Sequence, residues 1–321
     1  MMTKSKPYTG DLDPGLLPRD RQLVCEAKSP IVIVIDITSS MGKLAVIFLN
    51  EMSRIAKQVG NYVDNPQISI CAVGDITCDP IPIQISDFSK PRNLASWARR
   101  ILITPEVTGG PDDFQESYEM PAYYYLEMTE LPNAETPLMI FIGDEAMRGN
   151  LDSNDLERHF GGQRQDTSAR QVFALLQAKF KENLFLIHRP CPIQETDEAI
   201  LRQWGKLIGK ERLLTLAGDM STADVLLGIV ALVHGKSFAE YSEDMAETGQ
   251  SVARIKATFK ALDFLQPLFS DGASTDAPKK KPARKTAPKK SGPDVLAVPV
   301  EKKKKKARPS QKPKESDAFR L

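Results

Sequence analysis

The chain has 321 residues, which allows about two domains of ordinary size, and 41% of them are apolar, which is enough for a sizeable core. Its net charge of +1 hides two unlike regions: residues 271–321 hold 16 Lys or Arg against 6 Asp or Glu, whereas residues 1–270 hold 27 against 36. The four cysteines form no CxxC pair and have no histidine at zinc-ligand spacing, which argues against a zinc site and favours a reducing compartment.

The first 20 residues lack the apolar run that a signal peptide needs. No stretch approaches the roughly 18 uninterrupted apolar residues of a membrane span. We therefore expect a cytoplasmic protein without membrane contact, or a nuclear one if the host is eukaryotic and reads the lysines near the C-terminus as an import signal.

The first predicted elements are an extended arm over residues 1–29 and a buried strand over residues 31–35. Five consecutive β-branched residues form this strand, a pattern typical of a parallel sheet that helices cover on both faces. The polar loop 36–42 follows, and apolar residues at helical spacing then predict a helix over about 43–63.

The alternation continues to residue 236. We predict further helices over 93–101, 116–128, 168–181, 195–207 and 221–234, and further strands over 67–73, 81–85 (an edge strand behind prolines), 138–142, 184–188 and 213–216. Strands that alternate with helices of this length predict a doubly wound, Rossmann-like α/β sheet, mostly parallel, with helices on both faces.

Two segments follow the predicted domain 30–236. Residues 237–269 have amphipathic helical spacing and are expected to pack on the body or to bind a partner. Residues 270–321 are rich in Lys, Pro and Ala, bury too little surface to offset chain entropy, and are predicted to be a disordered basic tail. The tail could contact nucleic acid without sequence preference, because its lysines are not interleaved with aromatic residues, or it could fold back on the acidic body.

Three polar loops are predicted at the carboxyl ends of the strands, where open α/β sheets bind ligands: 36–42, 108–113 and 143–145. Their carboxylates and hydroxyls suit a hard cation such as Mg²⁺, Mn²⁺ or Ca²⁺ rather than zinc. Asp36, Thr38 and Ser40 alternate along the first loop and can converge on one ion if that loop is extended. An Asp at the end of a buried strand is also common in doubly wound folds without metal.

Residues 32–42 resemble the DxSxS motif of von Willebrand factor A domains, the metal-ion-dependent adhesion site, with Thr38 in place of the commoner Ser. The resemblance covers roughly residues 30–235 and is greatest to intracellular, bacterial-type members. It implies a divalent cation, Mg²⁺ first, with hydroxyl ligands from Thr38 and Ser40 and with Asp36 and Asp144 binding directly or through water. For the second loop it implies either Thr108 or Asp112.

The resemblance implies a non-catalytic, metal-dependent protein–protein interaction, as in an intracellular adaptor of a multi-protein complex. One alternative is a Mg²⁺-dependent phosphatase of the haloacid-dehalogenase type with Asp36 as nucleophile, although the second Asp that these enzymes need is replaced by Thr38. Another alternative is a nucleic-acid-binding protein that acts through the tail. Outside the three loops, we interpret Asp75 and Asp79 as turn residues and Tyr118 as a core residue.

Overall fold

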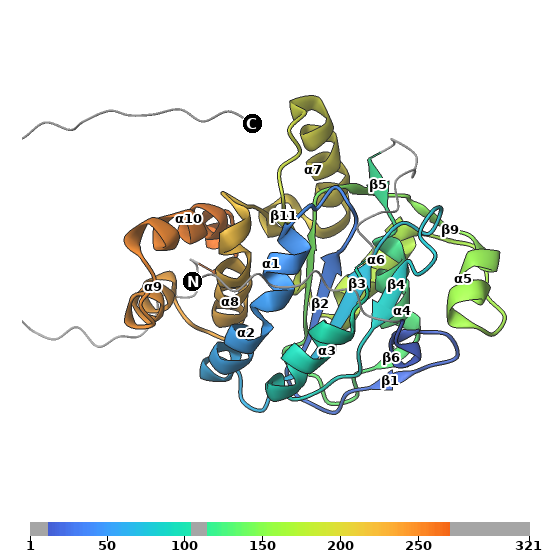
Figure 1. The fold of residues 1–321 in the computed structure, drawn as a ribbon, viewed down its shortest axis with the longest axis horizontal. Coiled ribbons are helices and arrows are strands. Elements are labelled where there is room, and N and C mark those ends of the chain that lie inside the picture. Colours follow the sequence, from blue (N-terminus) through green and yellow to red (C-terminus); the bar gives the residue numbers. More distant parts are fainter. Residues whose placement is uncertain (1–11, 104–113, 270–321) are drawn as a thin grey trace, which may run out of the picture. The chain divides into compact units, whose positions relative to one another are not determined.

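The structure, a computed structural model, describes residues 12–103 and 114–269, and a six-stranded sheet with the order β12-β11-β7-β2-β3-β4 forms its centre (Figure 1). The strand β4 pairs antiparallel with β3 at one edge, and the other pairings are parallel. The mostly parallel α/β sheet is therefore confirmed. Its strands are β2 (Pro30–Asp36), β3 (Gln67–Val73), β4 (Ile83–Ile85), β7 (Leu138–Gly143), β11 (Leu184–His188) and β12 (Leu213–Thr215).

The strand β2 separates two hydrophobic cores, because its side chains alternate between the faces of the sheet. Ile31, Ile33 and Ile35 belong to one core and Val32 and Val34 to the other, and all five are buried. Helices cover both faces (Figure 1). The first core contains α1 (Leu44–Asn50), α2 (Met52–Gln58), α3 (Leu94–Arg100) and α8 (Thr222–Val233), and the second contains α4 (Glu119–Glu127), α5 (Ser153–Phe160), α6 (Ala169–Lys179) and α7 (Gln194–Ile208).

Several predicted boundaries differ from the structure. The helix predicted over 43–63 is divided at Glu51 into α1 and α2, and a short 3-10 turn, Val59–Asn61, ends it. The helix predicted over 116–128 begins only at Glu119, because β5 (Gln115–Glu116) pairs with β8 (Ala146–Met147). The prediction also missed α5, which Asp152 caps by accepting the Asn154 N–H.

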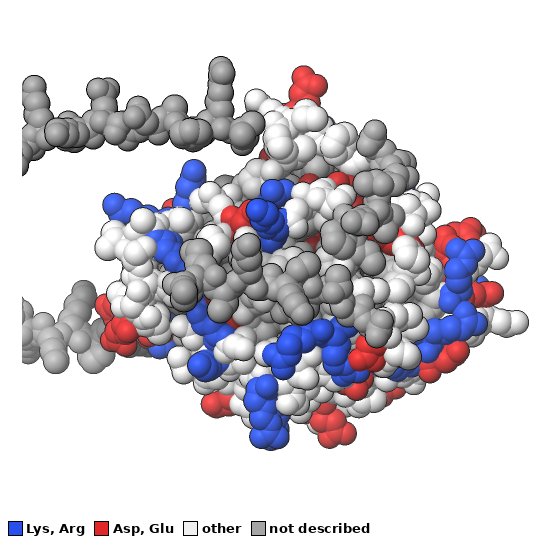
Figure 2. Space-filling view, viewed as in Figure 1, with Lys and Arg blue, Asp and Glu red and all other residues white. Residues whose placement is uncertain are grey.

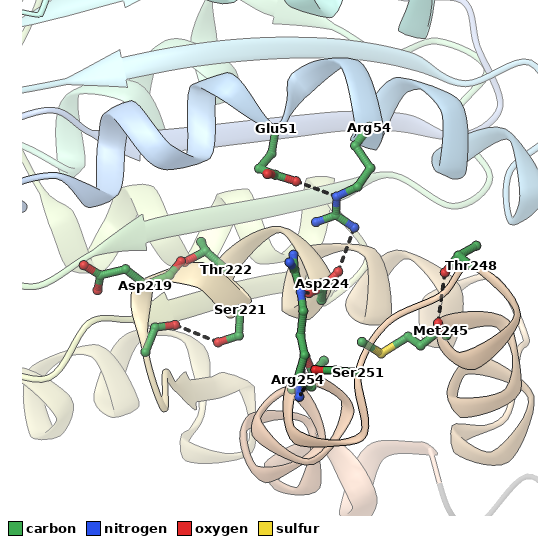
Figure 3. Close-up of polar contacts among 12 residues, drawn as sticks. Glu51, Arg54, Asp219, Ser221, Thr222, Asp224, Met245, Thr248, Ser251 and Arg254 are labelled. Atoms are coloured by element: carbon green, nitrogen blue, oxygen red, sulfur yellow. Dashed lines mark hydrogen bonds and ion pairs between the residues drawn. The ribbon is translucent and has the colours of Figure 1, made fainter. Parts of the chain in front are cut away.

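The segment 237–269 forms helices that pack on the body rather than one continuous helix. Gly249, with φ of +80°, separates α9 (Phe238–Glu247) from α10 (Val252–Leu262), and α11 (Gln266–Phe269) follows. In α8, the buried Asp224 accepts hydrogen bonds from Arg54 of α2 and Arg254 of α10 (Figure 3). A Cβ at Gly228 would lie 2.6 Å from Leu262, so α8 and α10 are in close contact.

The described part of the N-terminal arm also packs on the body. Its strand β1 (Leu23–Val24) pairs with β6 (Thr129–Glu130), and Leu16, Leu23 and Cys25 are buried. A further short pair joins β9 (Asn150–Leu151) to β10 (Thr167–Ser168). None of the helices within 12–103 and 114–269 has the length and apolarity to cross a membrane. The predicted basic tail lies outside the described residues.

Candidate metal centre

The candidate centre lies where the connections of the sheet change direction. The strand β2 has β3 on one side and β7 on the other, so the chain leaves β2 toward one edge and later returns to its opposite side. Asp36 ends β2, and Asp144 directly follows β7. Since β2 and β7 are parallel, both carboxylates lie at the same edge of the sheet, at the topological switch point where such folds bind ligands.

A chain of hydrogen bonds joins four of the predicted site residues. Asp36 Oδ1 accepts from the Thr38 N–H at 2.8 Å and from Thr38 Oγ1 at 2.6 Å. Thr38 Oγ1 lies 3.0 Å from Ser40 Oγ, and Ser40 Oγ donates to Asp144 Oδ1 at 3.0 Å. The structure therefore brings together Asp36, Thr38, Ser40 and Asp144.

The two candidate ligands of the second predicted loop, Thr108 and Asp112, lie outside the described residues. In the described part of the chain, no group of three or more His, Cys, Asp or Glu side chains is arranged to hold a metal ion. The gathered set consists instead of two carboxylates and two hydroxyls, whose oxygens fit a hard cation that retains several waters, as Mg²⁺ does.

Both carboxylates of the centre are buried, with exposed fractions of 0% for Asp36 and 5% for Asp144. Burial, followed by repulsion from Asp144, raises the pKa of Asp36 to about 8. Burial also raises the pKa of Asp144, although the hydrogen bond from Ser40 and the charge of Arg189 act against the increase. Two buried carboxylates at one place are unfavourable unless protons or a cation neutralise them.

Sequence reasoning missed two residues that contact these carboxylates. Tyr118, correctly predicted to be buried, also donates its hydroxyl to Asp36 Oδ2 at 2.5 Å. Arg189 follows β11 and donates through Nη1 to the Ser40 carbonyl at 2.9 Å and to Asp144 Oδ2 at 3.4 Å. The position of Arg189 at a strand end could have indicated its role, whereas no local pattern distinguishes Tyr118.

Glu116 is a third residue that the sequence did not single out. Its side chain is buried, and among the described residues its Oε2 has no hydrogen-bond partner. Burial, followed by repulsion from Asp36, raises its pKa to about 10. The Glu116 carboxyl group is therefore a third buried acidic group close enough to Asp36 for the two to interact.

The acidic character of the body is partly internal. On the face shown in Figure 2, acidic and basic side chains are interspersed. Among the described residues, no Lys or Arg is buried, whereas six acidic side chains are: Asp36, Asp75, Glu116, Glu119, Asp144 and Asp224. Asp36 ends β2 and Asp144 follows β7, so these two lie at the carboxyl edge of the sheet. A cation is the ligand that this edge favours electrostatically.

Asp75, after β3, is neutralised within the protein. Its carboxylate accepts from Arg148 Nη2 at 2.7 Å and from Arg148 Nε at 3.0 Å. Burial alone would raise the pKa of Asp75, but the hydrogen bonds from Arg148 and Thr77 outweigh it and lower the pKa. Asp75 accepts the Thr77 N–H and Asp79 accepts the Asp75 N–H, so both act as turn residues, as predicted.

No protein-family model matches the chain, and no curated protein matches it in sequence. Among solved structures, proximal thread matrix protein 1 from the mussel byssus aligns with 65% of this chain and 48% of its own, at 10% identity and a TM-score of 0.43. The pilus adhesin SpaC from Lactobacillus rhamnosus GG aligns with 67% of this chain and 32% of its own, at 11% identity and a TM-score of 0.43. The chain spans less than half the length of either structure.

Proposed function

We propose that the chain is a von Willebrand factor A-type domain that works as a non-catalytic, metal-dependent interaction module. A divalent cation, Mg²⁺ in preference to Mn²⁺ or Ca²⁺, binds at Asp36, Thr38, Ser40 and Asp144. Mg²⁺ retains several waters when proteins bind it, so the cation keeps exchangeable positions in its shell. A carboxylate of a protein partner then replaces one of those waters.

The observation that carries this proposal is the pair of buried carboxylates joined through two hydroxyls. Within the described residues, Asp36 forms no ion pair, and the cation nearest to Asp144 is Arg189, at 3.4 Å. One guanidinium balances one of the two negative charges. A divalent cation would balance both and would accept the same hydroxyl oxygens as ligands.

The contacts of Asp36 support a binding function rather than phosphoryl transfer. A haloacid-dehalogenase-type enzyme needs a general acid two residues after its nucleophile. Thr38 occupies that position and donates its hydroxyl to Asp36 instead. The hypothesis of nucleic-acid binding depends on the tail outside the described residues and stays a prediction.

Calorimetric titration of the metal-free protein with MgCl₂, MnCl₂ and CaCl₂ tests the cation site. We expect one saturable site in the wild type and a loss of affinity of about tenfold or more in Asp36→Ala and Asp144→Ala. Asp64→Ala is the matched control, because Asp64 is exposed and precedes β3 at the opposite edge of the sheet. Equal titrations in all four proteins would contradict the proposal.

Partner binding requires a second experiment. Wild type, Asp36→Ala and Asp64→Ala are used in parallel for affinity purification, each with Mg²⁺ and with EDTA. We expect a set of proteins that wild type and Asp64→Ala retain only with Mg²⁺ and that Asp36→Ala does not retain. A partner set that is insensitive both to EDTA and to Asp36→Ala would argue against metal-dependent capture.

A further inference from the structure

Tyr118 has an unusual position between the two strands that carry the carboxylates. It is fully buried directly before α4, and its hydroxyl reaches Asp36 at the end of β2. A Cβ at Gly143 of β7 would lie 2.0 Å from the same hydroxyl. Any side chain at Gly143 would therefore displace the phenol, so this glycine makes the contact between Tyr118 and Asp36 possible.

Neighbouring tyrosines of α4 use their hydroxyls differently. Tyr124 donates to the Arg21 carbonyl at 3.0 Å, and the Tyr125 hydroxyl lies 2.6 Å from Ser69 Oγ. Both are as fully buried as Tyr118 but bond to neutral structural groups. The contact between Tyr118 and an acidic residue of the centre is therefore not a general property of this helix.

The chemistry of the donor matters because Asp36 is buried. A buried carboxylate oxygen without a hydrogen bond is costly, so Asp36 Oδ2 needs a donor. Arginine would satisfy the oxygen but would also neutralise the charge, as Arg148 does at Asp75. A phenol supplies the hydrogen bond without adding a positive charge that would compete with a cation.

We propose that Tyr118 is a positioning residue of the cation site, which holds Asp36 Oδ2 through a neutral hydroxyl and so orients this side chain for a divalent cation without placing a competing positive charge beside it. Gly143 provides the space for it. This inference rests on the proposed function, because it concerns the same site. It adds a residue that lies directly before α4, outside the three polar loops, to the groups that determine cation affinity.

The structure also provides an internal reporter of the site. The Trp204 ring packs edge-on against Tyr118, with ring centroids 5.3 Å apart, and Trp204 Nε1 donates to the Glu145 carbonyl at 3.0 Å, next to Asp144. The chain has one other tryptophan, Trp97. In a Trp97→Phe background, the emission of Trp204 therefore follows changes at the site.

The test compares Tyr118→Phe with Tyr124→Phe, two substitutions that remove a buried hydroxyl from the same segment. Mg²⁺ affinity is measured by calorimetry and by Trp204 emission, and the melting temperature of each metal-free protein is recorded. We expect Tyr118→Phe to weaken Mg²⁺ binding about tenfold and Tyr124→Phe to leave it unchanged. Gly143→Ala, which displaces the phenol but keeps its hydroxyl, is expected to weaken binding in the same direction.

The outcomes separate this inference from the proposed function. If the wild type binds no divalent cation, the proposed function fails. If the wild type binds Mg²⁺ and Asp36→Ala does not, while Tyr118→Phe binds as tightly as Tyr124→Phe, only the role of Tyr118 is overturned. That role is also overturned if Tyr118→Phe does not fold and Gly143→Ala, folded, binds Mg²⁺ like the wild type.

Discussion

The tripeptide Asp-Ile-Thr occurs twice in the chain, at residues 36–38 and 75–77, and each copy follows one of two adjacent parallel strands, β2 and β3. The local hydrogen bonds are similar, although Thr38 donates twice to one oxygen of Asp36 and Thr77 donates once to each oxygen of Asp75. Each Asp accepts the N–H of its Thr at 2.8 Å, and each Thr hydroxyl also donates to its Asp, at 2.6 Å in the first copy and 2.7 Å in the second.

The two copies differ in what approaches them from distant parts of the chain. Asp75 receives the guanidinium of Arg148 and is neutralised. Asp36 receives the neutral phenol of Tyr118 and lies close enough to Asp144 for their charges to repel. One copy is thus a structural ion pair and the other is a candidate cation site, so the tertiary neighbours decide the role and the local motif does not.

The largest expected effect on stability is at the second copy. Asp75→Asn removes the carboxylate that accepts two hydrogen bonds from the partly buried Arg148 guanidinium, which should lower the free energy of unfolding by about 3 kcal/mol. Asp36→Asn in EDTA keeps an acceptor for Tyr118 and removes a repulsive charge, so it should destabilise far less. Urea denaturation of both variants measures the difference, and equal losses would remove the distinction between the copies.

The next largest effect is expected from alanine substitutions at two glycines in comparable positions. Gly74 and Gly143 each approach a polar side chain: a Cβ would lie 2.2 Å from Asp79 Oδ2 at Gly74 and 2.0 Å from the Tyr118 hydroxyl at Gly143. Each substitution by Ala should cost about 1–3 kcal/mol of stability through overpacking. Mg²⁺ titrations should distinguish them, because Gly143→Ala weakens cation binding and Gly74→Ala does not. Equal affinities in the two variants would argue that the carboxyl end of β7 has no special role.

The pH dependence of stability should also differ between the copies. The pKa of Asp36 is raised from 3.8 to about 8, so the folded metal-free state holds this proton more tightly, and its stability falls as the pH rises from about 4 to about 8. The lowered pKa of Asp75 has the opposite sign: it adds stability above the unfolded value, and this is lost as the pH falls through the folded pKa.

Melting temperatures in EDTA across this range check the prediction. Asp36→Asn should have a shallower slope than the wild type, but a slope should remain because the raised pKa of Glu116 acts in the same direction. Saturating Mg²⁺ should flatten the wild-type profile. Superimposable wild-type and Asp36→Asn profiles would show that the Asp36 carboxyl does not hold its proton more tightly when folded.

The smallest effects concern the two threonines. Thr38→Ser and Thr77→Ser both keep the hydroxyl that donates to Asp, so each should change stability by no more than about 0.5 kcal/mol. Thr38→Val removes the hydroxyl and should weaken Mg²⁺ binding, whereas Thr77→Val should leave it unchanged. A Mg²⁺ titration of the two Val variants is the measurement, and weakened binding in Thr77→Val would contradict the assignment.

Much of the fold could be predicted because its strongest signals are local. The β-branched run 31–35 predicted the central strand, and the prolines before Ile83 predicted the edge strand. The two-residue strands and α5 were missed, because short pairings such as β5 with β8 depend on partners about 30 residues away and leave no periodic pattern. Asp36, Thr38, Ser40 and Asp144 could be predicted to lie together, because they lie at or after the carboxyl ends of two strands.

The remaining parts of the site depend on contacts that sequence spacing does not encode. Tyr118 lies 82 residues from Asp36, and Arg148 lies 73 residues from Asp75. The two Asp-Ile-Thr copies are identical, so their sequence alone could not indicate which one receives an arginine. That Gly143 leaves space for the Tyr118 hydroxyl could be recognised only from the position of that hydroxyl in the fold.

Asp36 is expected to bind a divalent cation through its carboxylate, whereas Asp75 is not. The most direct measurement is calorimetric titration of metal-free wild type and Asp36→Asn with MgCl₂ at one pH and ionic strength. We expect one saturable site in the wild type and a loss of affinity of about tenfold or more in Asp36→Asn, with Asp64→Ala unchanged. Saturable binding of equal affinity in wild type and Asp36→Asn, or no binding by the wild type, would contradict this expectation.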